Sequence, residues 1–84
     1  MSKNSEVKLA KIVADLAIFL EFTSEELLDP DAAVEAMEQI AAELQLLGDE
    51  ERNNLAKIFI DLSNGYQGDK SEYVRDFPES LGLI

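Results

Sequence analysis

The sequence predicts an all-α fold, a small three- or four-helix antiparallel bundle with a short C-terminal helix and a docked apolar tail, in a single domain over residues 1–84. Apolar residues recur at steps of three and four along most of the chain, which is typical of amphipathic helices. No stretch alternates apolar and polar residues for long enough to form a β-strand. The segments between the apolar runs are short, which favours antiparallel neighbouring helices.

The first helix is predicted at about residues 5–21, after a polar segment at 1–5 that we expect to be frayed. Its side chains expected in the core are spaced three and four apart: Leu9, Ile12, Val13, Leu16, Phe19 and Leu20. Thr23 and Ser24, followed by two glutamates, predict a capped helical turn that connects this helix to the next.

The second helix is predicted at about 30–47. Asp29 and Pro30 suit its start, because an aspartate accepts hydrogen bonds from free amides and the fixed φ of proline matches the first helical position. Gly48 is expected to end the helix in a left-handed conformation. The side chains expected to be buried are Val34, Met37, Ile40, Ala41, Leu44 and Leu47.

The third helix is predicted to start at Asp49 as its cap and to end at Asn64–Gly65. Its expected buried residues are Leu55, Ile58, Phe59 and Leu62. Asp69 with Glu72 predicts a capping box for a short last helix that Pro78 stops. Inward positions are expected for Tyr73, Val74 and Phe77, and the tail with Leu81, Leu83 and Ile84 is expected to dock, because it is too apolar to lie in water.

Composition excludes several classes of function. The chain has 18 acidic and 7 basic residues, a formal charge of -11, no Cys and no His. It therefore lacks disulfides, thiol nucleophiles and the commonest general base, and we predict no enzyme and no cofactor. Its charge repels phosphate backbones and anionic lipids, so direct nucleic-acid or membrane partners are not expected. The start shows no secretory signal pattern, which favours a cytoplasmic location.

No metal site is predicted either. Residues 61–72 begin and end with acids, as a calcium-binding loop does, but Gly65 stands at the fifth position instead of the sixth. The end of a helix followed by a loop explains this segment better.

The negative charge is concentrated in residues 12–51, which contain twelve acids and no base. Asp31, Glu35 and Glu38 share one face of the second predicted helix, where like charges cost a few tenths of a kcal/mol per pair. Helix capping and solubility explain part of this pattern. The alternative is a surface that binds a basic protein. The candidate partner-binding residues are Glu25, Glu26, Asp29, Asp31, Glu35 and Glu38.

Ile18, Leu46 and Ile60 lie off the predicted buried stripes of their helices. Each either widens a buried face or belongs to a contact with a subunit or partner. The second possibility, together with the C-terminal tail, supports a homo-oligomeric structural or adaptor module, for instance a homodimer.

The short, acidic, helical chain with its band of carboxylates resembles small bacterial immunity proteins and antitoxins. It is similar to the colicin nuclease immunity proteins in size, charge and expected four-helix shape. The helix of that family with an aspartate and a pair of tyrosines has no counterpart here, so no site residues are carried over. The resemblance implies a non-enzymatic bacterial protein that binds and neutralises a basic protein, either a toxin or a nucleic-acid enzyme.

Overall fold

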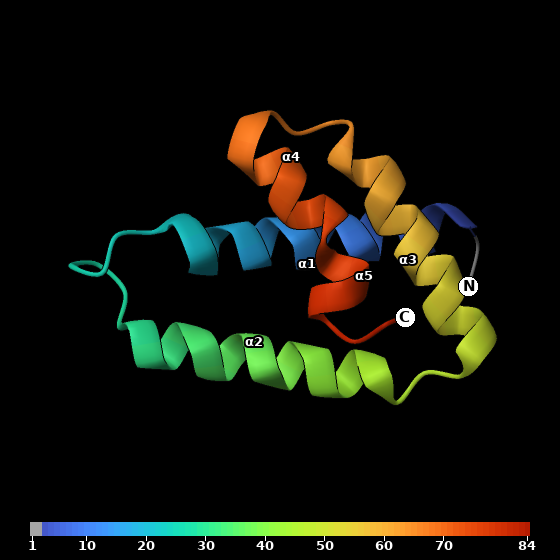
Figure 1. The fold of residues 1–84 in the computed structure, drawn as a ribbon, viewed down its shortest axis with the longest axis horizontal. Coiled ribbons are helices and arrows are strands. Elements are labelled where there is room, and N and C mark those ends of the chain that lie inside the picture. Colours follow the sequence, from blue (N-terminus) through green and yellow to red (C-terminus); the bar gives the residue numbers. More distant parts are fainter. Residues whose placement is uncertain (1–2) are drawn as a thin grey trace.

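The computed structural model describes residues 3–84, and over this range it contains five helices and no strand (Figure 1). The prediction of an all-α fold is confirmed. The helices are α1 (Lys3–Phe22), α2 (Pro30–Gln45), α3 (Asp49–Ser63), α4 (Gly68–Arg75) and α5 (Phe77–Ser80).

Helices α1 and α2 run antiparallel and are joined by a connector, residues 23–29 (Figure 1). Helix α3 packs against α1, α4 and α5, while α2 packs against α1. Of the segment predicted to fray, residues 1–2 lie outside the described residues and residues 3–5 form the first turn of α1. Pro78 was expected to stop a helix, but it lies in the first turn of α5, where its missing N–H costs nothing.

The large side chains of the core come from α3, α4 and α5. Phe59, Val74 and Phe77 have no exposed surface. The rings of Phe59 and Phe77 meet edge to face, with centroids 5.1 Å apart, and Tyr73 meets Phe77 in the same way at 5.0 Å. Edge-to-face aromatic pairs add stability beyond the area that they bury. The inward positions predicted for this segment are confirmed.

The predicted docking of the C-terminal tail is confirmed for Leu81 and Leu83 and is wrong for Ile84. Leu81 and Leu83 are buried, whereas Ile84 is 72% exposed. Gly82 between the two leucines has a φ of +72°, in the left-handed region that favours glycine. The side-chain amide Nε2 of Gln45 donates a hydrogen bond to the carbonyl oxygen of Leu81 at 2.9 Å and so joins the end of α2 to the tail.

The buried face of α1 is not the one that the large apolar residues predict. Helix α1 packs on the core through three alanines, Ala10, Ala14 and Ala17, which are at most 2% exposed. At 100° per residue, these alanines lie roughly 150° around the helix from Leu9, Ile12, Leu16 and Phe19. The prediction is wrong for Leu9, Ile12, Leu16 and Phe19, which are between 48% and 56% exposed. Small side chains allow α1 to lie close to its neighbours, and this leaves the large ones outside.

No residue of α2 is fully buried. Of its predicted buried stripe, Met37, Ala41 and Leu44 pack against the core while still partly exposed, and Val34 is 57% exposed. The predicted stripe therefore does face the core, but its side chains are only partly buried. Helix α2 lies on the bundle and is not enclosed by it.

The predicted helix caps are only partly confirmed. Asp29 caps α2, because its side chain accepts a hydrogen bond from the backbone N–H of Asp31 at 3.0 Å. Gly48 was expected to be left-handed but has a φ of -66° and is the N-cap of α3, so Asp49 is the first helical residue and not the cap. Helix α4 also starts without a side-chain cap hydrogen bond, so the capping box predicted at Asp69 does not form.

Candidate functional site

The connector presents the first part of the predicted acidic surface. Its turn is held by Ser24, whose hydroxyl accepts a hydrogen bond from the backbone N–H of Glu26 at 3.2 Å. The carbonyl of Ser24 accepts from the N–H groups of Leu27 and Leu28, which closes one helical turn as predicted. Glu25 and Glu26 are exposed in this turn, and Asp29 is exposed at the start of α2.

The second part of the acidic surface is a row on α2. Asp31, Glu35 and Glu38 are all exposed and stand four and three residues apart, so they share one side of the helix. The ion pairs found among the described side chains join Lys11 to Asp15 and Arg52 to Asp49. The row therefore has no internal counter-charge within the described residues, and its electrostatic field extends into the solvent.

Two exposed apolar side chains lie among these carboxylates. Leu27, in the connector, is 83% exposed, and Val34, one turn from both Asp31 and Glu38, is 57% exposed. Apolar anchors surrounded by charged residues are typical of protein-binding surfaces. The sequence did not predict these contacts, because Leu27 was assigned only to the connecting turn and Val34 to the core.

A groove of about 290 Å³ lies next to the row, between the end of α1, α2 and the segment from α4 to α5. Glu21 and Glu38 line it together with Met37 and Tyr73. The hydroxyl of Tyr73 donates a long hydrogen bond to the sulfur of Met37, at 3.9 Å. Burial of the ring raises the pKa of Tyr73, and the nearby carboxylate of Glu21 raises it further. The Tyr73 side chain is therefore uncharged at physiological pH where it lines this groove.

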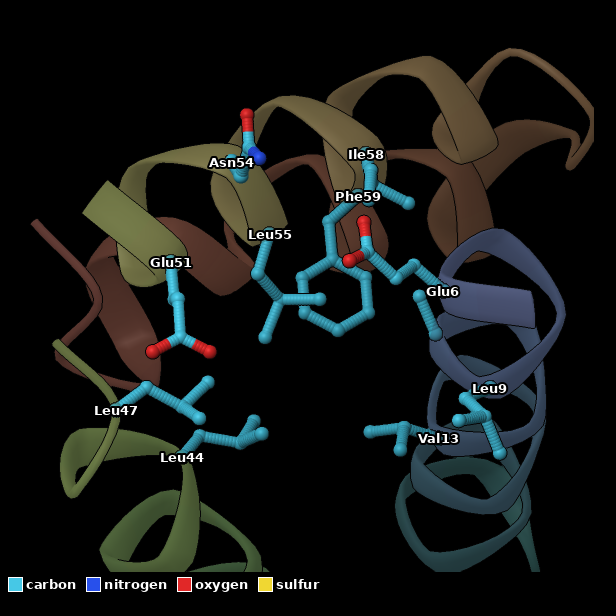
Figure 2. A pocket seen from close by; sticks show the side chains of 11 residues that line it. Glu6, Leu9, Val13, Leu44, Leu47, Glu51, Asn54, Leu55, Ile58 and Phe59 are labelled. Carbon is cyan, nitrogen blue, oxygen red and sulfur yellow. The ribbon is translucent and has the colours of Figure 1, made fainter. Parts of the chain in front are cut away.

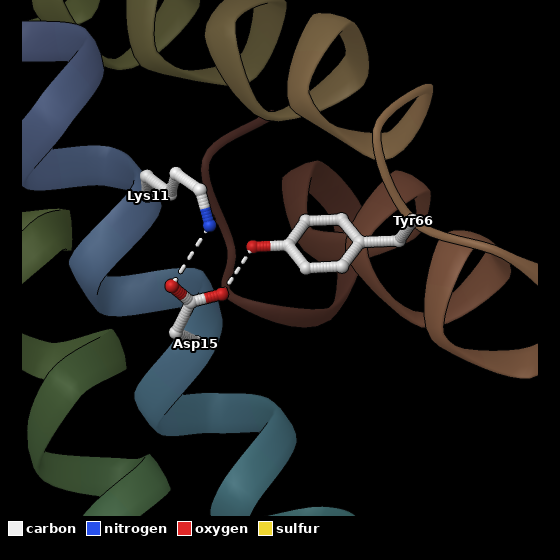
Figure 3. Close-up of polar contacts among 3 residues, drawn as sticks. All are labelled: Lys11, Asp15 and Tyr66. Atoms are coloured by element: carbon white, nitrogen blue, oxygen red, sulfur yellow. Dashed lines mark hydrogen bonds and ion pairs between the residues drawn. The ribbon is translucent and has the colours of Figure 1, made fainter.

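A polar cluster on the other side of α1 joins that helix to the loop between α3 and α4 (Figure 3). The Nζ of Lys11 lies 2.9 Å from Oδ2 of Asp15, and the hydroxyl of Tyr66 donates a hydrogen bond to Oδ1. The ammonium of Lys11 also lies 5.3 Å from the centre of the Tyr66 ring, close enough for a cation–π contact.

The charges in this cluster reinforce one another. The hydrogen bond from Tyr66 and the one from Lys11 lower the pKa of the Asp15 carboxyl. The same bond to Asp15 raises the pKa of Lys11. Burial raises the pKa of Tyr66, and Asp15 adds to that shift. The cluster keeps Asp15 ionised and fixes the position of the loop on α1, which is a structural role.

A second groove, of about 320 Å³, opens between α1, the end of α2 and α3 (Figure 2). Its walls are apolar, and the carboxylates of Glu6 and Glu51 are its charged groups. The apolar side chains come from all three helices: Leu9, Val13, Leu44, Leu47, Leu55, Ile58 and Phe59. Within residues 3–84 no cluster of three or more acidic, His or Cys side chains could hold a metal ion.

The outward face of α1 is an exposed apolar feature that the sequence did not predict. It consists of Leu9, Ile12, Leu16 and Phe19, which the analysis assigned to the core. The signal that could have located it is the repetition of Ala10, Ala14 and Ala17 at i, i+4 and i+7. This spacing gives α1 a second apolar stripe, and Val13, which packs against the core, lies between it and the exposed side chains.

The three residues off the predicted stripes separate into two groups. Ile18 packs against the core while partly exposed, so it widens a buried face. Leu46 and Ile60 are 80% and 46% exposed, respectively. Solitary exposed apolar residues are common on protein surfaces, and neither Leu46 nor Ile60 belongs to α1.

None of the helices in the described part of the chain is long and apolar enough to cross a membrane. Comparisons of the chain with models of protein families, with curated proteins and with solved structures gave no match.

Proposed function

We propose that this chain is a non-enzymatic, acidic binding protein that neutralises a basic protein partner in the cytoplasm, in the manner of an immunity protein or antitoxin that blocks a toxin. The acidic surface formed by the connector and α2 would contact a basic region of the partner. Leu27 and Val34 would supply apolar contacts within it. The association is stoichiometric and changes no covalent bond.

One observation carries the proposal. All six carboxylates of the acidic surface are exposed, and none of them forms an ion pair with a described basic side chain. Asp29 has a structural role as a helix cap, but the charge row on α2 adds repulsion without a compensating contact. A basic partner removes this repulsion on binding, and the same field accelerates its diffusional approach.

Binding fits the remaining features better than catalysis. The chain has neither His nor Cys. Asp15 is the carboxyl with the clearest hydrogen-bonding partners, and these lower its pKa, whereas a general acid near neutral pH needs a raised one. Both grooves have mainly apolar walls.

The test is capture of a partner from the lysate of the source cell on three immobilised forms of the protein. The first is the wild type. The second carries the reversals Asp31→Lys, Glu35→Lys and Glu38→Lys on α2. The third is a control with the same change in net charge, Asp61→Lys, Glu72→Lys and Glu79→Lys, at exposed positions on α3, α4 and α5. Circular dichroism verifies that all three are equally helical.

We expect one basic protein to be retained by the wild type and the control, to be released by salt and to be lost by the α2 variant. When the purified wild type is mixed with that protein at a one-to-one ratio, it should inhibit the activity of that protein. Equal retention by all three forms, or no salt-sensitive retention by the wild type, would show that the acidic surface does not bind a partner.

A further inference from the structure

The outward face of α1 is too apolar and too continuous to be an ordinary solvent-exposed surface. Its members, Leu9, Ile12, Leu16 and Phe19, are 48%, 54%, 53% and 56% exposed. They follow one another along one side of the helix for almost three turns. Exposed apolar residues that occur singly are normal, but a continuous patch of large ones marks a contact surface. Leu9 also lines the groove that leads to α2 and α3 (Figure 2).

The accessible surface of the chain is larger than its mass predicts. The accessible surface is 5830 Å² for a mass of 9.3 kDa. A compact monomeric protein of this mass exposes about 5,000 Å². The excess over the whole surface is about 800 Å², which is similar to the area that each partner buries in an interface of standard size.

We propose that the outward face of α1 is covered by the same face of a second copy of this chain, with the two α1 helices antiparallel across a two-fold axis. The spacing of the face is the same read from either end, with steps of three, four and three residues. In an antiparallel pair, Leu9 therefore lies opposite Phe19 of the second copy, and Ile12 lies opposite Leu16. Such self-complementarity is what a two-fold contact requires.

The distribution of charge favours a second copy in this orientation. Residues 3–12 of α1 contain three lysines and one glutamate, whereas residues 13–22 of α1 contain two acids, Asp15 and Glu21, and no base. Asp15 also pairs with Lys11 of its own chain. An antiparallel pair places the basic half of each α1 beside the acidic half of the other, while a parallel pair would place like charges together. The face itself contains no carboxylate, so a basic protein would gain no charge complementarity from it. The acidic row of α2 is separate from this face and stays available in the dimer.

Sedimentation equilibrium on the purified chain, between about 1 and 300 µM, tests the dimer without any other partner, so its outcome is independent of the proposed function. We expect the mass to rise to twice 9.3 kDa. Leu16→Glu and Ile12→Glu should each raise the dimer Kd by roughly 100-fold. The control Leu46→Glu, at an exposed apolar position outside the face, should leave the Kd unchanged. Circular dichroism identifies any variant that has lost its fold.

Disulfide cross-linking tests the orientation, because the natural chain has no cysteine. A mixture of Leu9→Cys and Phe19→Cys chains should form a mixed disulfide, whereas neither variant should cross-link to itself. In the antiparallel pair two copies of position 9 are about 15 Å apart along the axis, which is too far for a disulfide. A strict monomer over the whole range, a dimer unaffected by Leu16→Glu or self-cross-linking at position 9 would each overturn the proposal. The first of these would mean that a different protein covers the face.

Discussion

Replacing Ala14 by Leu tests which face of α1 is buried. Ala14 has no exposed surface and lies between Ala10 and Ala17 in the contact of α1 with the rest of the bundle. Leucine adds three carbon atoms at a filled position, and such overpacking costs about 1–3 kcal/mol. A domain of 84 residues has a total stability of about 4–12 kcal/mol. A loss of about 2 kcal/mol should therefore lower Tm by about 8–16 °C.

The matched control on the same helix is Leu16→Ala. Because Leu16 is 53% exposed, its truncation should cost about 1 kcal/mol or less in the monomer. Both variants are measured by urea unfolding followed by circular dichroism, at a concentration where sedimentation shows a monomer, so that self-association does not contribute. If Leu16→Ala costs more free energy of unfolding than Ala14→Leu, the orientation of α1 described here is wrong.

Three further predictions concern the C-terminal tail, the polar cluster and the cap of α2. Gly82→Ala should cost about 1–2 kcal/mol, because its φ is +72° and a Cβ there would lie 2.6 Å from Nε2 of Gln45; a neutral result in chemical denaturation would contradict the description of the tail. Tyr66→Phe should cost about 0.5 kcal/mol at pH 7. The hydroxyl of Tyr66 bonds to the ionised carboxylate of Asp15, whose pKa is lowered in the folded state. The difference in stability should therefore vanish as the pH falls below about 4 and this carboxyl is protonated; a pH-independent difference between the two unfolding curves would argue against the bond. Asp29→Ala should cost about 1 kcal/mol and Asp29→Asn much less, since the amide oxygen can also cap the helix; equal losses of Tm would show that the charge, and not the cap, matters for stability.

Helix positions and helix ends were largely predictable, because the signals that define them are local. Asp29 and Pro30 start α2 by their own side-chain chemistry, and this holds whatever α2 packs against. Gly48 was misjudged because α2 ends earlier than its apolar pattern indicates, so the glycine serves the start of the next helix. A glycine between two helices can end one or begin the other, and only the packing of the helices decides between these roles.

The rotation of α1 could not be predicted in this way, because it depends on which of two apolar stripes meets the core. Large side chains gain more from burial than alanines, so the stripe with Leu16 was the expected choice. The structure instead packs Ala14 against the bundle. The predicted acidic surface is exposed as expected, because the polar side of α2 follows directly from the position of its stripe. The rotation of α1 decides where its exposed apolar face lies.

The lack of any fully buried side chain in α2 has a consequence for how the protein moves. Opening of α2 exposes little apolar area, so its amides should exchange with deuterium at a lower free energy than those of α3, which contains Phe59. We therefore expect the helix that carries the acidic row to open as a cooperative unit of its own, attached to the tail through Gln45. A partner that binds the row must also order this unit. Part of the binding free energy would thus appear as slower exchange along α2, and the dissociation rate would depend on how firmly that helix is attached.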